Sequence, residues 1–116
     1  MTKKIQAGII GGAGYTGGET VRLLLNHPQV ELKFVQSRSQ AGKPITSIHG
    51  DLVGETNLTF SADFNQEVDV LFLCLSHGES KKLLSETTFP ATTHIIDLGN
   101  DFRLGDSVSG REFVYG

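Results

Sequence analysis

The sequence predicts an α/β fold, in which helices on both faces cover a doubly wound, mostly parallel sheet. Three observations lead to this prediction. Short apolar runs alternate with amphipathic segments, most runs end in glycine-rich or polar clusters, and one run is apolar almost throughout. An uninterrupted apolar run is typical of a parallel strand that helices cover on both faces.

The composition predicts one small globular domain over residues 1–116. Of the 116 residues, 38% are hydrophobic and 20% are charged, which is ordinary for such a domain. A net charge of −3 indicates no nucleic-acid partner, and no apolar run is long enough for a membrane span. The single cysteine, Cys74, excludes an internal disulfide and a multi-cysteine metal site. We therefore expect a cytoplasmic protein that binds no metal, membrane or nucleic acid.

A glycine-rich turn follows the first apolar run, and the rest of the fold is arranged around it. The turn reads Gly12-Ala13-Gly14-Tyr15-Thr16-Gly17 and matches the spacing G-x-G-x-x-G. We expect Gly12 to allow the tight bend, Gly14 to admit a pyrophosphate, and Gly17 to let the next helix pack closely. The helix would direct its first N–H groups at the phosphates, as in a Rossmann-type dinucleotide-binding domain. A tight turn without a ligand is the alternative.

The remaining elements alternate in the order that a parallel sheet requires. Helices are predicted over residues 15–26 and 81–86, with a short helix that begins near Pro44. After the first run, strands are predicted over residues 30–36, 58–61, 68–75 and 94–98. Residues 111–116 resemble the beginning of another element.

The residues after the second strand indicate which dinucleotide the domain binds. An NAD site usually places an acid roughly 20 residues after the glycines, where it bonds the ribose 2′-hydroxyl. Here the strand ends in Gln36-Ser37-Arg38-Ser39, without an acid. A guanidinium flanked by two hydroxyls suits a 2′-phosphate, so Ser37, Arg38 and Ser39 predict NADP as the cofactor. A solvated loop arginine is the alternative for Arg38.

Polar clusters also follow the later strands, at the edge where ligands bind to such sheets. Ser76 and His77 are predicted to line the cofactor pocket, with an ordinary hydrogen-bonded loop histidine as the alternative for His77. Arg103 lies on the same ligand face, where a pair with Asp97 or Asp101 is the structural interpretation. We expect Cys74 to be a core residue rather than a nucleophile, and His49 to be structural or solvated.

Four motifs in a fixed order carry a family resemblance. They are Gly11-Gly12-Ala13-Gly14-Tyr15-Thr16-Gly17-Gly18-Glu19, Ser37-Arg38-Ser39-Gln40-Ala41-Gly42-Lys43, Leu75-Ser76-His77-Gly78-Glu79-Ser80 and Ile96-Asp97-Leu98-Gly99-Asn100-Asp101-Phe102-Arg103-Leu104. Together they resemble the N-terminal part of the N-acetyl-gamma-glutamyl-phosphate reductase family over essentially the whole chain. The sister family, aspartate-semialdehyde dehydrogenase, shares the fold and the chemistry but usually lacks the tyrosine of the first motif. Gly99-Asn100 and Ser76 depart from the usual serine-alanine and proline of the family.

The resemblance implies the NADP-dependent reduction of an acyl phosphate to a semialdehyde in arginine biosynthesis. It implies that Arg103 helps to hold the phosphate of this small-molecule substrate. The catalytic cysteine and histidine of the family belong to later motifs, so this segment supplies no catalytic residue. It would be the inactive nucleotide-binding part of a longer enzyme, which we expect to be a homo-oligomer. A regulatory NADP-binding module without chemistry is the alternative from another class.

Overall fold

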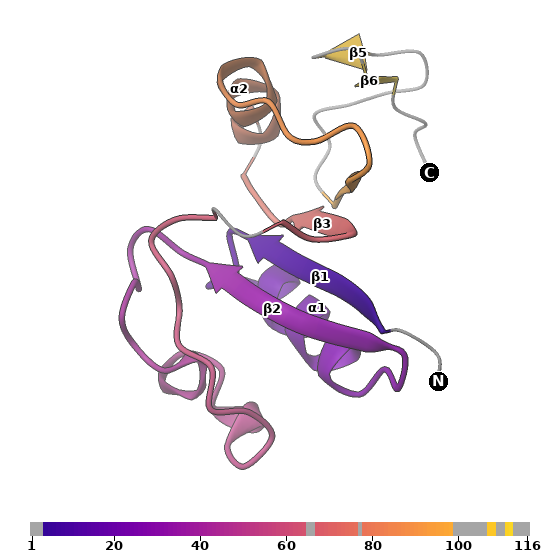
Figure 1. Cartoon of the computed structure of the whole chain (residues 1–116). Coiled ribbons are helices and arrows are strands. Elements are labelled where there is room, and N and C mark those ends of the chain that lie inside the picture. Colours follow the sequence, from indigo (N-terminus) through magenta and orange to yellow (C-terminus); the bar gives the residue numbers. More distant parts are fainter. Residues whose placement is uncertain (1–3, 65–66, 77, 99–106, 109–110, 113–116) are drawn as a thin grey trace.

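The computed structural model describes residues 4–64, 67–76, 78–98, 107–108 and 111–112. Its main sheet has four parallel strands in the order β2-β1-β3-β4 (Figure 1). The strands are β1 (Ile5–Ile10), β2 (Val30–Gln36), β3 (Val70–Leu73) and β4 (His94–Asp97). The chain places β2 on one side of β1 and then crosses to β3 on the other side. This change of direction makes the sheet doubly wound, as predicted, and opens a crevice at the carboxyl end of β1.

Two α-helices connect these strands. Helix α1 (Tyr15–Leu25) follows β1, and helix α2 (Glu79–Glu86) follows β3. Between β2 and β3 the chain forms two single turns of 3₁₀ helix, η1 (Ile45–Ser47) and η2 (Gly50–Leu52). Near the end of the chain, β5 (Ser107–Val108) pairs antiparallel with β6 (Arg111–Glu112).

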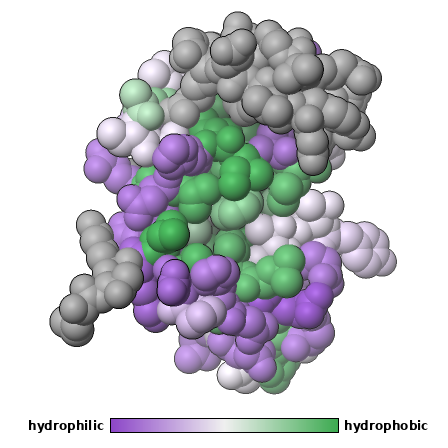
Figure 2. Space-filling model, turned by 90° about the vertical axis from the view of Figure 1, so that its right-hand side faces the viewer, coloured by the Kyte–Doolittle hydropathy of each residue, from purple (hydrophilic) through white to green (hydrophobic). Residues whose placement is uncertain are grey.

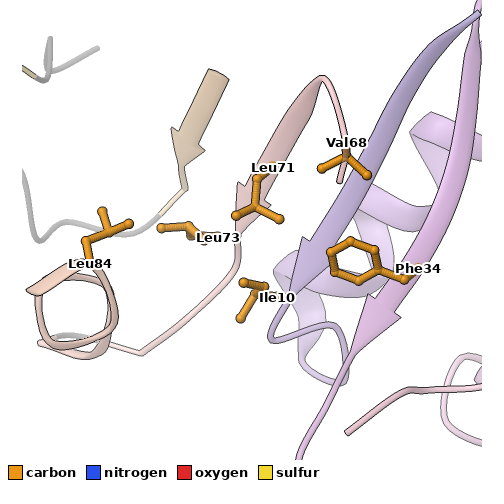
Figure 3. Packing of buried hydrophobic residues seen from close by; sticks show 6 residues of the cluster. All are labelled: Ile10, Phe34, Val68, Leu71, Leu73 and Leu84. Carbon is orange, nitrogen blue, oxygen red and sulfur yellow. The ribbon is translucent and has the colours of Figure 1, made fainter. Parts of the chain in front are cut away.

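The apolar core has two halves, because consecutive strand residues point to opposite faces of the sheet. On one face, a cluster joins the strands to α1 and to the η1–η2 segment; its buried members are Ile9, Val21, Val35, Ile45, Leu52 and Phe60. On the other face, a second cluster joins the strands to α2; its buried members are Ile10, Phe34, Val68, Leu71, Leu73 and Leu84 (Figure 3). Helices therefore cover both faces, as the sequence predicts.

One predicted strand is wrong. Residues 58–61 form no strand and make only two isolated bridges, Gln36 with Ser61 and Pro44 with Thr59. The Phe60 backbone bonds instead to Gly42 and Lys43, at N–O distances of 2.8 and 2.9 Å. The segment meets the sheet only at Ser61, which bonds to the end of β2, and the Phe60 ring fills the core beside α1.

Boundaries of four predicted elements also shift, and the smallest shift is that of β4, which ends at Asp97 instead of residue 98. The apolar strand is confined to Val70–Leu73, shorter than residues 68–75, although Asp69 and Cys74 on either side of it still donate to carbonyls of β1 at 2.8 and 2.9 Å. Helix α2 begins two residues earlier than predicted, directly after Gly78, whose φ of 86° starts the turn. Helix α1 ends at Leu25, where Asn26 caps it by a bond from Nδ2 to the Arg22 carbonyl at 2.9 Å.

Candidate functional site

A cleft of about 600 Å³ opens at the carboxyl ends of β1 and β3, beside the segment that leaves β2. Its wall is formed by the glycine turn, the residues after β2 and β3, and one side of α2. Six of the predicted cofactor residues line this cleft: Ala13, Gly14, Ser37, Arg38, Ser39 and Ser76. The cleft lies where the strand order changes direction, which is the usual ligand site of such sheets.

The bend of the glycine turn lies one residue earlier than expected. Gly11 has a φ of +84°, and a Cβ there would lie 2.6 Å from the Cys74 carbonyl oxygen, so only glycine fits. Gly12 serves a packing role instead. A Cβ on Gly17 would lie 2.6 Å from the Gly12 backbone, so the first turn of α1 rests directly on the glycine turn. The predicted close packing at Gly17 is therefore observed.

Gly14 differs from these glycines because the fold itself does not require it. Its φ of −84° and ψ of −176° are open to any residue, and a Cβ there would meet nothing within 4 Å. Gly14 is the N-cap of α1, no side chain caps that helix end, and Tyr15 beside it is 98% exposed. The open space in front of a bare helix N-terminus fits the pyrophosphate of a dinucleotide.

Gln36, the last residue of β2, holds the glycine turn in place through hydrogen bonds. Its carbonyl oxygen accepts bonds from the N–H groups of Gly11 and Gly12, both at 2.9 Å. Its side-chain Oε1 lies 3.2 Å from the Gly11 nitrogen, and its Nε2 donates to the Ala62 carbonyl at 3.3 Å. Both ends of this buried carboxamide are therefore occupied by protein. Sequence reasoning missed this role, and the place of Gln36 at the end of the strand was its only signal.

The segment after β2 presents one cation to the cleft. Ser37 is buried, with its Oγ 3.3 Å from the Gln40 nitrogen and 3.5 Å from the Ser39 Oγ. Arg38 and Ser39 are exposed at the rim of the cleft. This arrangement holds the backbone of the segment while it leaves the guanidinium accessible to a ligand.

Cys74 is half-buried: it packs against the core cluster beside α1, as expected, and also lines the wall of the cleft. Its Sγ lies 3.7 Å from the Thr20 Oγ1 on α1. Burial raises the pKa of the Cys74 thiol, the hydrogen bond to Thr20 lowers it in part, and the nearby Asp97 carboxylate raises it further. The thiol is thus kept protonated at neutral pH, which does not suit a nucleophile.

The structure brings further residues to the cleft that sequence reasoning missed. Glu79, Lys82 and Glu86 line it from one side of α2, and Phe64 lines it from the loop before β3. Ser80 on α2 donates to the Asp97 Oδ1 at 2.9 Å and so ties this helix to the end of β4. The predicted sites at His77 and Arg103 lie outside the described residues.

The described residues form neither a membrane-spanning helix nor a cluster of metal ligands. Among them, no helix has the length and apolar character needed to span a membrane. No group of three or more His, Cys, Asp or Glu side chains in the described ranges lies in a position to hold a metal ion.

Comparison with known proteins identifies relatives of this chain. The family model described as "Semialdehyde dehydrogenase, NAD binding domain" matches residues 6–116. The chain is 55% identical over 112 residues to the N-acetyl-gamma-glutamyl-phosphate reductase of Christiangramia forsetii. These residues cover 97% of this chain and 34% of that protein. The same enzyme of Flavobacterium johnsoniae is 51% identical over 114 residues, which cover 97% and 35% of the two chains. The chain thus spans about a third of the length of these curated relatives.

A solved structure supports the fold. The aspartate semialdehyde dehydrogenase of Candida albicans, solved with NADP, matches with a TM-score of 0.66 and 20% identity over 85% of this chain and 30% of that chain. At this identity the match supports the doubly wound fold alone. The family model covers nearly the whole sequence, so the chain belongs to the family of NAD-binding domains of semialdehyde dehydrogenases.

Proposed function

We propose that this chain is the NADP(H)-binding domain of an N-acetyl-gamma-glutamyl-phosphate reductase. Such an enzyme reduces N-acetyl-glutamyl 5-phosphate to N-acetyl-glutamate 5-semialdehyde in arginine biosynthesis. The observation that carries the proposal is the identity of 46–55% to reductases of this name over 97% of the chain. We further propose that this enzyme is cytoplasmic, acts on a small-molecule acyl phosphate and assembles as a homo-oligomer.

The residues of the cleft fit a dinucleotide in two places. The open position at Gly14, before the uncapped start of α1, would receive the pyrophosphate. Arg38, between Ser37 and Ser39, would bind the 2′-phosphate of the adenosine ribose by charge-assisted hydrogen bonds. Ala13 lies in the turn before Gly14, and Tyr15 and Thr16 are the first two residues of α1.

The preference for NADP over NAD rests on the end of β2. The segment after β2 has no carboxylate that accepts a bond from a ribose 2′-hydroxyl, and the Gln36 carboxamide is occupied by Gly11 and Ala62. Among the described residues of this segment, Arg38 is the cation that lines the cleft. Bound NADPH supplies the hydride of the reaction, and this domain's part is to hold the cofactor at the sheet edge.

The decisive experiment assays the full-length enzyme for phosphate-dependent oxidation of N-acetyl-glutamate 5-semialdehyde with NADP. We expect turnover with this substrate and little with aspartate 4-semialdehyde. Turnover of aspartate 4-semialdehyde alone would place the enzyme in the sister family. NADPH binding without turnover of either substrate would instead indicate a regulatory module.

Arg103 is proposed to hold the phosphate of the substrate. Arg103→Lys keeps the charge but loses the planar fork that binds two phosphate oxygens at once. We therefore expect the variant to lose turnover with the acyl phosphate while its NADPH affinity stays close to that of the wild type. Steady-state kinetics and calorimetric titration measure the two effects separately, and a loss confined to NADPH affinity or thermal stability would contradict the assignment.

A further inference from the structure

His49 contacts the glycine turn directly, although it lies 37 positions away from Gly12 in the sequence. Its Nε2 lies 2.7 Å from the Gly12 carbonyl oxygen. A carbonyl oxygen only accepts hydrogen bonds, so His49 donates through Nε2–H. Gly12 is then held on both sides, because its own N–H donates to the Gln36 carbonyl at 2.9 Å.

The imidazole is fixed in place by its surroundings. The His49 backbone N–H donates to the Ile45 carbonyl at 2.9 Å, and its carbonyl accepts from Leu52 at 3.0 Å. Ile45 and Leu52 are both buried in the core cluster beside α1, so the residues on either side of His49 are anchored. The ring meets Phe60 edge-on, with the ring centroids 6.1 Å apart.

The other side of the imidazole lies against the first turn of α1. A Cβ on Gly18 would come within 2.7 Å of the His49 ring atoms Cε1 and Nδ1, so a glycine makes room for the ring. The ring is therefore held by contacts with Gly18 and Phe60. This packing leaves Nε2 aimed at the Gly12 carbonyl.

The bond to Gly12 determines how the next peptide group is turned. In a trans peptide, the carbonyl of Gly12 and the N–H of Ala13 point in opposite directions. His49 holds the carbonyl on its own side, away from the cleft, whereas Ala13 and Gly14 line the cleft. We propose that His49 is a positioning residue for the dinucleotide, which keeps the Gly12–Ala13 peptide turned so that the Ala13 N–H faces the pyrophosphate.

This inference rests on the proposed binding of NADP(H), and its test compares ligands with and without a pyrophosphate. In the full-length enzyme, His49→Phe keeps an aromatic ring against Phe60 but removes the donor to Gly12. The variant leaves a partly buried carbonyl without its partner, so the dissociation constant for NADPH should rise about 10-fold. The constant for NADH should rise by the same factor, because both cofactors carry the pyrophosphate.

Binding of 2′-AMP separates positioning from general damage. This ligand carries the adenosine 2′-phosphate but no pyrophosphate, so its affinity for His49→Phe should equal that of the wild type. His49→Gln, which retains an N–H donor, should recover part of the NADPH affinity. His94→Phe, a matched change at an exposed histidine of β4, should leave all three affinities unchanged.

The outcomes distinguish the two proposals. Equal losses of affinity for 2′-AMP and NADPH would show that His49 only stabilises the fold, and unchanged NADPH affinity in His49→Phe would also overturn its role. If His49→Phe does not fold, His49→Asn, whose shorter side chain cannot reach Gly12, carries the same comparison. A wild-type enzyme that binds no NADPH would overturn the proposed function itself.

Discussion

Arg38 is the residue at which cofactor preference is most directly tested. It is exposed at the rim of the cleft, and the serines on either side of it help to hold the backbone there. Arg38→Ala removes the charge proposed to bind the 2′-phosphate, and a charge-assisted bond contributes roughly 1.5–3 kcal/mol. The affinity for NADPH should therefore fall about 10- to 150-fold, while the affinity for NADH stays nearly constant.

Calorimetric titration of the full-length enzyme with both cofactors measures this preference. Lys43→Ala is the matched control, because Lys43 is an exposed cation of the same crossover that does not line the cleft. It should leave both affinities unchanged. Equal affinity of the wild-type enzyme for NADPH and NADH would contradict the assignment of Arg38.

Cys74 provides a second prediction at the scale of one residue. Because burial and Asp97 raise the pKa of its thiol, we expect Cys74→Ala to keep its turnover in the full-length enzyme. The variant loses packing in the cleft wall, which should lower the free energy of unfolding by about 1–2 kcal/mol. A folded Cys74→Ala enzyme without turnover would identify Cys74 as the nucleophile after all.

The pH dependence of this stability has a definite sign. The folded protein favours the neutral thiol of Cys74, which therefore adds to the free energy of unfolding. This contribution is complete at a pH below the pKa of the thiol in the unfolded chain, and it is lost as the pH rises through the higher pKa of the folded protein. The difference in unfolding free energy between wild type and Cys74→Ala should therefore shrink in alkaline buffer. Denaturant titrations near neutral pH and above the ordinary thiol pKa measure this difference, and a gap that widens would contradict the raised pKa.

At the scale of one element, the start of α1 separates binding from folding. The position of Gly14 has open space and ordinary backbone angles, whereas Gly17 lies against the Gly12 backbone. Gly14→Val should therefore fold normally but abolish dinucleotide binding, because its side chain occupies the place of the pyrophosphate. Gly17→Val should destabilise the protein itself. Thermal unfolding and NADPH titration distinguish the two, and wild-type affinity in Gly14→Val would show that the motif is only a turn.

The sequence allowed the parallel strands and both α-helices to be predicted because their apolar spacing is strong and local. It did not reveal the path of residues 58–61, since their apolar pattern suits both a strand and the loop that inserts Phe60 into the core. It placed the bend of the turn at Gly12 instead of Gly11, because spacing does not show backbone angles. The contacts of Gln36 and His49 depend on tertiary structure, so no local pattern indicates them.

The candidate site was predicted to a similar extent. Residues 12–17, 37–39 and 76 were expected at the ligand edge, because motifs at strand ends place them there. Residues 13, 14, 37–39 and 76 line the cleft, whereas residues 12 and 15–17 do not. The polar side of α2 was missed, since its charges resemble those of any solvated helix. Roles that depend on His77 and Arg103 remain predictions.

At the scale of the whole molecule, two exposed apolar side chains lie at one edge of the described sheet. Strand β4 lies at this edge, and within and just after it Ile96 and Leu98 are 42% and 44% exposed. Figure 2 shows hydrophobic residues gathered over the centre of one face of the molecule. The curated relatives are about three times as long as this chain. The full reaction is proposed for the longer enzyme, so binding and kinetic measurements are made on that enzyme.

The last prediction is that the 116-residue chain has no turnover by itself. Reduction of an acyl phosphate through a thioester requires a thiolate, an acid or base, and a hydride at one carbonyl carbon. The chain offers a site for the cofactor, but its single thiol, Cys74, is held protonated. The isolated chain should therefore show no phosphate-dependent oxidation of the semialdehyde under conditions in which the full-length enzyme turns over. Circular dichroism confirms that the isolated chain is folded in the assay, and turnover by that folded chain would place the active site within these residues.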